Sequence, residues 1–346
     1  MTQTPAHRLI DGHLDLALGA LEGRDPALSL DELRRLPLFT GVPGEAPQTP
    51  SVTFGELQAA GLGLCFGTLF ARKGGAWPYT PGGYTDTEGA RQEALRSLDW
   101  YHRWQDAGLI RLLPNRTALM AHLNDWEAGA DLPLGVALLM EGADPVRGAD
   151  DLPFWAEQGV RLIGPAWRGT RYAGGTGEPG GLTEAGHALL QAMADLNLTL
   201  DASHLDDAAF WDALPYGTRV IATHSNARHF IDSNRLLSDD MIRAIGERGG
   251  VVGVVPANFF IRAGWRTGQE RVPLQELSEH ARHIAGLIGW ERVALGSDFD
   301  GGFGTEQLPA GLERYPDLHQ LAQTLPAEHR AGFLWDNWAR WLREHY

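Results

Sequence analysis

Residues 198–204 read LTLDASH, and residues 219–226 read RVIATHSN. Each stretch is a short apolar run followed by a histidine, His204 in the first and His224 in the second. Similar runs alternate along the chain with longer stretches in which apolar residues recur at helical spacing. This alternation is typical of an α/β fold. Several of the runs are almost continuously apolar, as expected for parallel strands that are buried on both faces.

Eight such runs are predicted to be strands. A chain of 346 residues with eight strands and helices between them fits one TIM-like (β/α)8 barrel. We therefore expect residues 1–346 to form a single domain, because barrels of this length are common. The predicted strands are Arg8–Asp15, Gly63–Phe70, Gly135–Glu141, Val160–Ala166, Leu198–Ser203, Arg219–Thr223, Gly250–Pro256 and Arg292–Gly296.

The periodic stretches predict helices at Thr85–Asp106, Thr183–Leu196 and Gln275–Ile288. Two stretches rich in glycine and proline, Leu36–Val52 and Arg168–Gly181, are predicted to be loops that form lids or pocket walls at the catalytic face.

Additional C-terminal helices, Asp317–Leu325 and Ala327–Glu344, are expected after the last strand. They would close the bottom of the barrel or form an interface. Trp335, Trp338 and Trp341 fall at helical spacing there, so they would pack a terminal helix or a homodimer contact.

The composition argues against several classes of function. The chain has 29 basic and 44 acidic residues, a net charge of −15. An acidic surface repels phosphate backbones and anionic headgroups, which argues against binding nucleic acid or a membrane surface. No secretory signal and no apolar run of membrane-spanning length is evident, and the single cysteine, Cys65, excludes an intrachain disulfide. We therefore expect a cytoplasmic enzyme or binding protein.

Six side chains with metal-binding chemistry stand at the carboxyl ends of predicted strands. Taken singly, each has an ordinary explanation, either a solvated carboxylate or a histidine hydrogen-bonded in a loop. The strand ends of a (β/α)8 barrel converge on one pocket, however, so the six would be neighbours. Imidazoles and carboxylates brought together in this way bind divalent cations. The six residues are His13, Asp15, Glu141, His204, His224 and Asp298.

These residues lie in motifs that resemble those of the renal or membrane dipeptidase family, which are zinc peptidases of the amidohydrolase superfamily. The motifs run in the family's order from residue 11 to residue 302. They are Asp-Gly-His13-Leu-Asp15, Glu141-Gly-Ala-Asp, Gly-Leu-Thr-Glu-Ala-Gly with Leu-Asp-Ala-Ser-His204, Thr-His224-Ser-Asn-Ala, Gly-Val-Val-Pro-Ala-Asn258-Phe and Gly-Ser-Asp298-Phe-Asp-Gly.

The resemblance implies two divalent metal ions, and a ligand set without cysteine favours Zn²⁺. It also implies hydrolysis of a small dipeptide by a hydroxide that bridges the ions. Asp298 would take the proton of the water and pass it to the leaving amine. The resemblance assigns His13, Asp15 and Asp298 to one ion, His204 and His224 to the other, and Glu141 to both.

Substrate contacts follow from the same resemblance. Arg235, eleven residues beyond His224, stands where the family carries an arginine that holds the substrate carboxylate. A guanidinium suits this role because its fork matches a carboxylate. Asn258 is expected among the substrate contacts as well.

The chain departs from the family pattern at Trp167, which stands in place of a histidine that contacts the substrate near the reacting carbonyl. Tryptophan offers one N–H and no positive charge. Arg168 and Arg171 are candidate substitutes for the missing donor.

Three functions remain open at this point. The first is the dipeptidase. The second is an amidohydrolase that acts on another small amide, such as a lactam or an N-acyl amino acid, and the tryptophan at position 167 keeps it open. The third is a non-catalytic barrel that binds metal, against which Asp298 argues, because a structural site gains nothing from a proton acceptor.

Overall fold

The structure is a computed structural model that describes residues 8–36, 48–74 and 83–346. Within these residues, eight parallel strands form the barrel wall, one for each strand predicted from the sequence. They are β1 (Leu9–Leu14), β2 (Leu62–Phe70), β4 (Leu134–Glu141), β5 (Val160–Gly164), β8 (Thr199–Asp201), β9 (Arg219–Ile221), β10 (Val252–Val254) and β11 (Val293–Leu295).

The strands curl round into a closed wall. Strands β1, β2, β4, β5, β8 and β9 form one continuous sheet in that order, and β10 pairs with β11. The pair is joined to the sheet at both of its edges. Ala222, just after β9, bridges to Val252 in β10, and the N–H of Asp298, just after β11, donates to the carbonyl oxygen of His13 over 3.1 Å. The architecture is therefore the expected (β/α)8 barrel.

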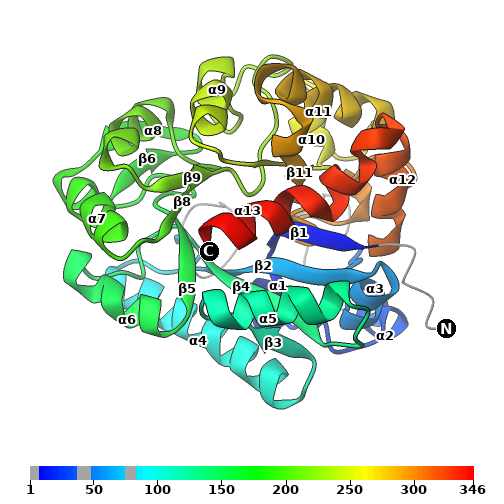
Figure 1. Ribbon diagram of the computed structural model, residues 1–346, viewed down its shortest axis with the longest axis horizontal. Helices are drawn as coiled ribbons and strands as arrows, with labels where there is room; N and C mark the ends of the chain where they lie inside the picture. Colours follow the sequence, from blue (N-terminus) through cyan, green and yellow to red (C-terminus); the bar gives the residue numbers. More distant parts are fainter. Residues whose placement is uncertain (1–7, 37–47, 75–82) are drawn as a thin grey trace.

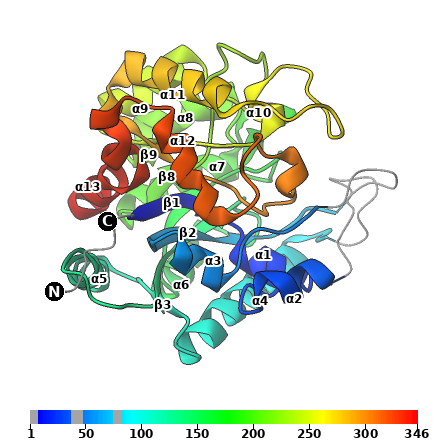
Figure 2. The ribbon, with the colours of Figure 1, turned by 90° about the vertical axis from the view of Figure 1, so that its right-hand side faces the viewer.

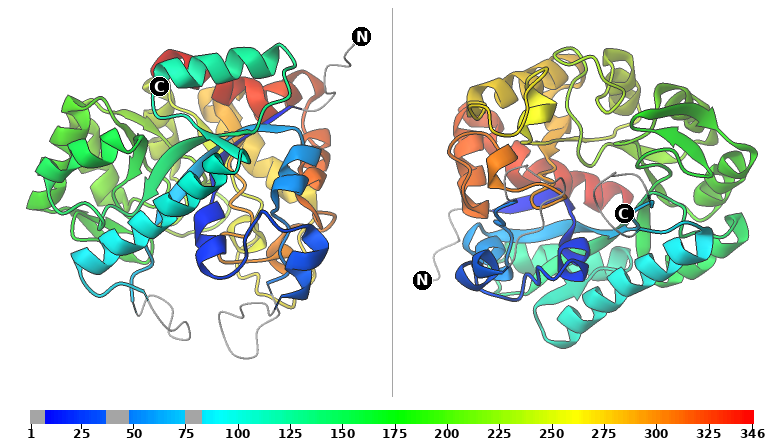
Figure 3. Two further views of the ribbon diagram at one scale, coloured as in Figure 1. Left: turned by 90° about the horizontal axis from the view of Figure 1, so that it is seen from below. Right: turned by 180° about the vertical axis from the view of Figure 1, so that it is seen from behind.

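Helices surround the strands (Figure 1; Figure 3, right). The three long predicted helices are present as α4 (Thr87–Asp106), α7 (Glu184–Asp195) and α11 (Leu274–Ile288). Thr183 caps α7, since its side chain accepts the N–H of Gly186. Other helices are α1 (Leu16–Leu21), α2 (Leu30–Arg35), α3 (Phe54–Ala59), α5 (Arg116–Glu127), α6 (Leu152–Glu157), α8 (Asp207–Ala213), α9 (Asp239–Glu247), α10 (Asn258–Ile261) and α12 (Leu318–Gln323). None of the helices in the described ranges is both long enough and apolar enough to cross a membrane.

The glycine-rich stretch 168–181 is not the plain loop that was predicted. It contains an antiparallel hairpin of β6 (Ala173–Gly175) and β7 (Glu178–Leu182). The two strands approach so closely that a Cβ on Gly174 would lie 2.3 Å from the backbone nitrogen of Gly180. Glycine thus permits a pairing that bulkier residues would prevent. A further short strand, β3 (Ile110–Leu112), pairs with β4. Of the other predicted loop, 36–52, residues 37–47 lie outside the described residues.

The C-terminal segment closes the bottom of the barrel, one of the two roles expected for it. The predicted helix over 327–344 is interrupted, because a π-helical turn at Gly332–Asp336 precedes α13 (Asn337–His345). Trp338 of α13 is fully buried against Phe66 of β2, with ring centroids 5.0 Å apart. Its Nε1 donates to the carbonyl oxygen of Leu295 over 2.8 Å. Figure 1 shows α13 lying across the ring of strands, and Figure 2 shows it at the end opposite α1 and α10.

Candidate metal centre

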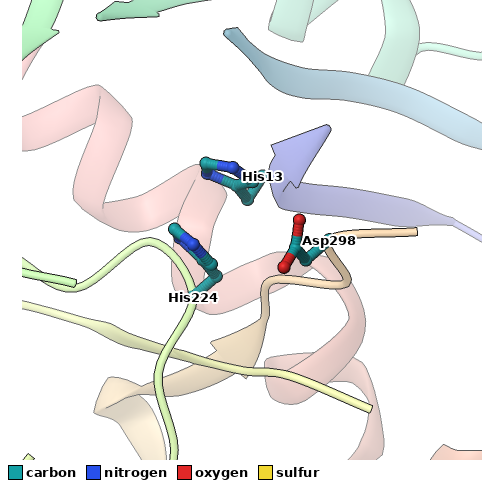
Figure 4. A group of neighbouring side chains, drawn as sticks. All are labelled: His13, His224 and Asp298. Atoms are coloured by element: carbon teal, nitrogen blue, oxygen red, sulfur yellow. The ribbon is translucent and has the colours of Figure 1, made fainter. Parts of the chain in front are cut away.

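All six predicted ligand side chains meet, buried, at the carboxyl ends of the barrel strands. Figure 4 shows three of them, His13 from the end of β1, His224 from the loop after β9 and Asp298 from the loop after β11, pointing toward one another. Among the described residues, overlapping groups of three side chains lie close enough to hold an ion. The groups are His13, His224 and Asp298; Glu141, His204 and His224; and His13, Asp15 and Glu141.

Glu141, the last residue of β4, lies at the middle of this centre. Its Oε1 is 3.1 Å from Nε2 of His204 and 3.6 Å from Nε2 of His224. Its Oε2 is 3.5 Å from Nε2 of His13. The two oxygens therefore face different imidazoles, as the two oxygens of a carboxylate shared between two ions would.

Thr223 orients two of the histidines. Its Oγ1 lies 3.3 Å from Nδ1 of His13 and 2.9 Å from Nδ1 of His224, and its hydroxyl donates to Asp201 over 2.6 Å. Hydrogen bonds at Nδ1 turn Nε2 toward the centre and fix the tautomer, as is usual around metal-binding histidines. Sequence reasoning missed this role, and the only signal was that Thr223 precedes His224.

The third histidine has its own partner. Oγ1 of Thr176, in the β6–β7 turn, lies 2.9 Å from Nδ1 of His204. The hairpin thus reaches over the metal centre as well as forming part of the cavity wall. Nothing in the sequence pattern singled out Thr176.

Glycines make room for Thr223 inside the barrel. A Cβ on Gly253 of β10 would lie 2.0 Å from the carbonyl oxygen of Thr223, and one on Gly296 would lie 1.8 Å from it. No side chain fits at such distances. These two glycines therefore allow the chain that carries Thr223 and His224 to come close to β10 and the end of β11.

Burial and close charges shift the pKa values of the ligands. Burial lowers the pKa of His13, but the charges of Glu141, Asp15 and Asp298 outweigh it and raise that pKa to about 10. Burial raises the pKa of Asp15 to about 6 and that of Asp298 well above its usual value. Burial, helped by a nearby arginine, lowers the pKa of His204 to about 4. Three carboxylates thus share a buried space with few compensating charges, and a divalent cation would supply that charge.

The atoms themselves also fit a cation. Within the described part of the chain, the buried Nε2 of His13 has no hydrogen-bond partner. A buried nitrogen without a partner is costly unless something binds it. Three imidazole nitrogens and three carboxylates, without cysteine, form a donor set that suits zinc.

The centre forms the floor of a cavity of about 500 Å³, which Trp167, Arg168 and Arg235 also line. Arg235 is buried, and its guanidinium donates to the carbonyl oxygens of Ser203 (2.9 Å) and His224 (3.0 Å). A guanidinium has five N–H donors, so donors remain beyond these two bonds. Arg235 is therefore fixed in place with capacity to bind an anion.

Two candidate contacts, Asn258 and Arg171, are not among the lining residues that the structure describes for this cavity. Asn258 is not among the described residues that line it, because its side chain is buried and spans Leu308 (Nδ2 to O, 2.9 Å) and the N–H of Val272 (3.3 Å). Asn258 thus joins two backbone segments, and its role as a substrate contact stays a prediction. Arg171 is likewise turned aside, with its guanidinium donating to the carbonyl oxygen of Val146.

The model of the membrane dipeptidase family, peptidase family M19, matches residues 4–345. The chain belongs to this family. A Klebsiella pneumoniae protein, described only as an uncharacterized protein in the pqqA 5′ region, is 35% identical over 258 residues, which are 69% of this chain and 93% of that protein. An uncharacterized dipeptidase of Schizosaccharomyces pombe is 37% identical over 142 residues, 40% of this chain and 33% of that protein.

Solved structures that are similar to this chain include a metallopeptidase from Rhodobacter sphaeroides bound to a phosphinate mimic of the dipeptide L-Ala-D-Ala. It is 25% identical with a TM-score of 0.80, and the match covers 98% of this chain and 99% of that one. Membership of the membrane dipeptidase family makes this protein a metal-dependent hydrolase of the dipeptidase type, in agreement with the clustered ligands at the strand ends.

Proposed function

We propose that this member of the membrane dipeptidase family hydrolyses the peptide bond of free dipeptides and uses two zinc ions to do so. The proposal rests on one observation: the predicted metal ligands around Glu141 and the buried guanidinium of Arg235 face the same cavity. The ligands form its floor, and Arg235 is part of its wall. The Rhodobacter sphaeroides relative binds a mimic of a dipeptide, which supports the same class of substrate here.

The six predicted ligands would be divided between two metal ions. When bound, the two ions would polarise the scissile carbonyl as Lewis acids and make a water acidic enough to ionise near neutral pH. Glu141 is the shared ligand, since its two oxygens face different histidines. We assign His13, Asp15 and Asp298 to one ion and His204 and His224 to the other.

Asp298 is the proton acceptor in this proposal. Its carboxylate lines the cavity, and burial raises its pKa, which makes it a stronger base. It would take the proton of the attacking water and return it to the leaving amine. Both transfers occur on the cavity side of the centre, where the substrate enters.

Arg235 is the proposed partner of the substrate's C-terminal carboxylate. It is held by two backbone carbonyls, and its guanidinium carbon lies 4.7 Å from the centre of the Phe260 ring. A charged group fixed in this way loses little freedom when it binds a carboxylate. Trp167 stands where the family has a histidine that contacts the substrate near its reacting carbonyl. Tryptophan carries no positive charge, and this difference supports a second candidate function, hydrolysis of another small amide such as a lactam or an N-acyl amino acid.

The test compares dipeptides that have a free carboxylate with the same dipeptides amidated at the C-terminus. The zinc-loaded parent should prefer the free forms, and Arg235→Met should lower kcat/KM for them by roughly 10- to 150-fold, because a hydrogen bond to a charged group is worth about 1.5–3 kcal/mol. The loss for the amidated forms should be smaller. Because Arg235 also supports the backbone beside His224, zinc content is measured for each variant.

Arg228→Met is the matched control. Arg228 lies in the same segment but is paired with Asp207 and does not line the cavity among the described residues. Its ratio of free to amidated activity should equal that of the parent. A parent that cleaves both forms equally well would show that the carboxylate is not recognised, and the broader amidohydrolase function would then take precedence.

A further inference from the structure

We propose that the β6–β7 hairpin selectively holds the zinc ion assigned to His204 and His224, with Thr176 as the positioning residue and Asn234 as the residue that fixes the hairpin. The inference rests on the two-zinc function proposed above and concerns how the two ions differ within it. Its basis is a set of hydrogen bonds from the hairpin that reaches a ligand of one ion and, within the described residues, no ligand assigned only to the other.

Thr176 lies at the tip of the hairpin, between β6 and β7. Its Oγ1 is 2.9 Å from Nδ1 of His204, and Nε2 of the same imidazole is 3.1 Å from Oε1 of Glu141. A hydrogen bond at Nδ1 fixes the tautomer and the ring orientation of a histidine whose Nε2 binds a metal ion. Thr176 therefore acts on the ion through His204 and does not need to touch the ion itself.

The side chain of Asn234 fixes the tip of the hairpin. Its Oδ1 accepts the N–H of Gly177 over 3.1 Å, and its Nδ2 donates to the carbonyl oxygen of Gly175 over 3.1 Å, so the amide holds the residues on both sides of Thr176. Nδ2 also donates to Oδ1 of Asp206 over 2.8 Å. An asparagine amide has two N–H donors and one acceptor oxygen, and this arrangement uses all of them. Replacing Asn234 would thus release the tip of the hairpin.

The chain that follows His204 pairs with the same hairpin. Leu205 forms an antiparallel bridge with Gly175. The N–H of Asp206 donates to the carbonyl oxygen of Gly174 over 3.2 Å. His204 is therefore connected to the hairpin both by its side chain and by the backbone after it, so a displaced hairpin would displace the imidazole.

The residue after Asn234 supports the same ion from the backbone. Arg235 donates to the carbonyl oxygen of Ser203, directly before His204, and to that of His224. The adjacent residues Asn234 and Arg235 therefore hold both histidines of this ion, one through the hairpin and both through the backbone.

The ligands assigned only to the other ion have different partners. Asp15 accepts a hydrogen bond from Thr68 of β2. The N–H of Asp298 donates to the carbonyl oxygen of His13. In the part of the chain that the structure describes, no hairpin residue is bonded to these three ligands. Loss of the hairpin contact should therefore weaken one ion and spare the other.

The test measures zinc affinity in Thr176→Val, which keeps the volume of the side chain and removes its hydroxyl. In competition with a chelator of known affinity, this variant should hold one of its two zinc ions roughly 10- to 100-fold more weakly than the parent and the other as tightly as the parent does. Thr176→Ser keeps the hydroxyl and should restore the parental affinity. Equal affinities for the valine and serine variants would overturn the inference.

Asn234→Leu tests the hairpin itself. It should weaken the same ion, and adding Thr176→Val to it should cost little more, because both substitutions act through the bond to His204. Fully additive losses would show that the two residues act independently, against the inference.

Thr183→Val is the matched control for a general loss of structure. Thr183 follows β7 and caps α7, so the same substitution removes a hydrogen bond at the other end of the hairpin. Thr183 is not among the described residues that line the cavity. The variant should unfold at a lower urea concentration but bind both zinc ions as the parent does. If it weakened zinc as much as Thr176→Val, general loosening would explain both results and the inference would be wrong.

His204→Ala identifies the ion. In this variant the remaining zinc should be held equally with and without Thr176→Val, because the residue through which Thr176 acts is gone. A further loss in the double variant would contradict the inference. A parent that cleaved no dipeptide would refute the proposed activity without changing these zinc measurements. A parent that held a single zinc would refute the two-ion function, and the inference would then stand only if Thr176→Val, but not Thr176→Ser, weakened that ion.

Discussion

Asp298 combines a strained backbone with the chemistry proposed for it. Its φ is 56°, in the left-handed region that few residues other than glycine adopt. Its N–H is bonded to the carbonyl oxygen of His13, so the strain occurs where the end of β11 joins β1. Backbone strain of this kind persists only where the surrounding structure enforces it, and it is common at active sites.

Replacing Asp298 by asparagine tests the proton transfer. Asparagine tolerates a positive φ, so the backbone should keep its shape while the basic group is lost. Turnover should fall by roughly 10²- to 10⁴-fold if the proton transfer limits the reaction. Zinc content is measured beside the rate, because an amide is a poorer ligand. Near-native turnover with full metal content would mean that another group takes the proton.

A second prediction at the residue scale concerns Thr223. Thr223→Val keeps the volume but removes the hydroxyl that holds His13 and His224, so zinc affinity should fall by roughly 10- to 100-fold. Thr223→Ser keeps the hydroxyl and should stay close to the parent. Competition with a chelator of known affinity measures both variants. Equal affinities for the valine and serine variants would exclude an orienting role.

At the scale of elements, buried side chains join neighbouring strands near the metal centre. Asp11 of β1 accepts from Ser297, just after β11, at the backbone nitrogen (2.7 Å) and at Oγ (2.5 Å). Asp201 of β8 accepts from the backbone nitrogen (2.9 Å) and the Oγ1 (2.6 Å) of Thr223 after β9. Each carboxylate thus joins two strand ends that carry predicted metal ligands.

The C-terminal helix α13 should be essential for stability because Trp338 fills the lower end of the barrel. Trp338→Ala should lower the free energy of unfolding by about 3–5 kcal/mol, through lost burial and a cavity that the barrel cannot close. Urea unfolding of the zinc-loaded protein measures the change. Trp211→Ala is the control, since Trp211 is 45% exposed and its loss should cost less than about 0.5 kcal/mol. Similar losses for both variants would contradict the closing role.

For the whole molecule, metal binding and protonation are coupled. We expect about two zinc ions per chain by elemental analysis. In the metal-free protein the pKa of His13 is raised to about 10 and that of Asp15 to about 6, so zinc must displace the proton of His13 at neutral pH. Zinc affinity should therefore rise with pH between about 6.5 and 8.5, by up to tenfold per unit for each proton released.

Zinc affinity is expected to rise with pH because the pKa of His13 is raised. A raised pKa means that the folded, metal-free protein holds the proton over a wider pH range, and binding becomes easier as pH approaches that pKa. Chelator competition at several pH values, corrected for protonation of the chelator, measures the slope. An affinity independent of pH, or uptake of no zinc at all, would contradict the proposed centre.

Much of this arrangement could be read from the amino-acid order alone. The eight strands are recognisable because each is a short apolar run, and a local pattern of this kind needs no long-range information. The predicted metal ligands follow from the same property, since a polar residue directly after a buried strand must lie at its carboxyl end. In a barrel all such ends meet, so His13 and Asp298 could be placed together although 285 positions separate them.

Other features could be identified only from the tertiary structure. The bonds of Thr223 to two histidines and of Asn258 to two backbone segments were not predicted, because the partners of a hydrogen bond come from segments with no pattern in common. The hairpin at 173–182 depends on glycines that meet face to face, and a glycine-rich stretch by itself indicates only a loop.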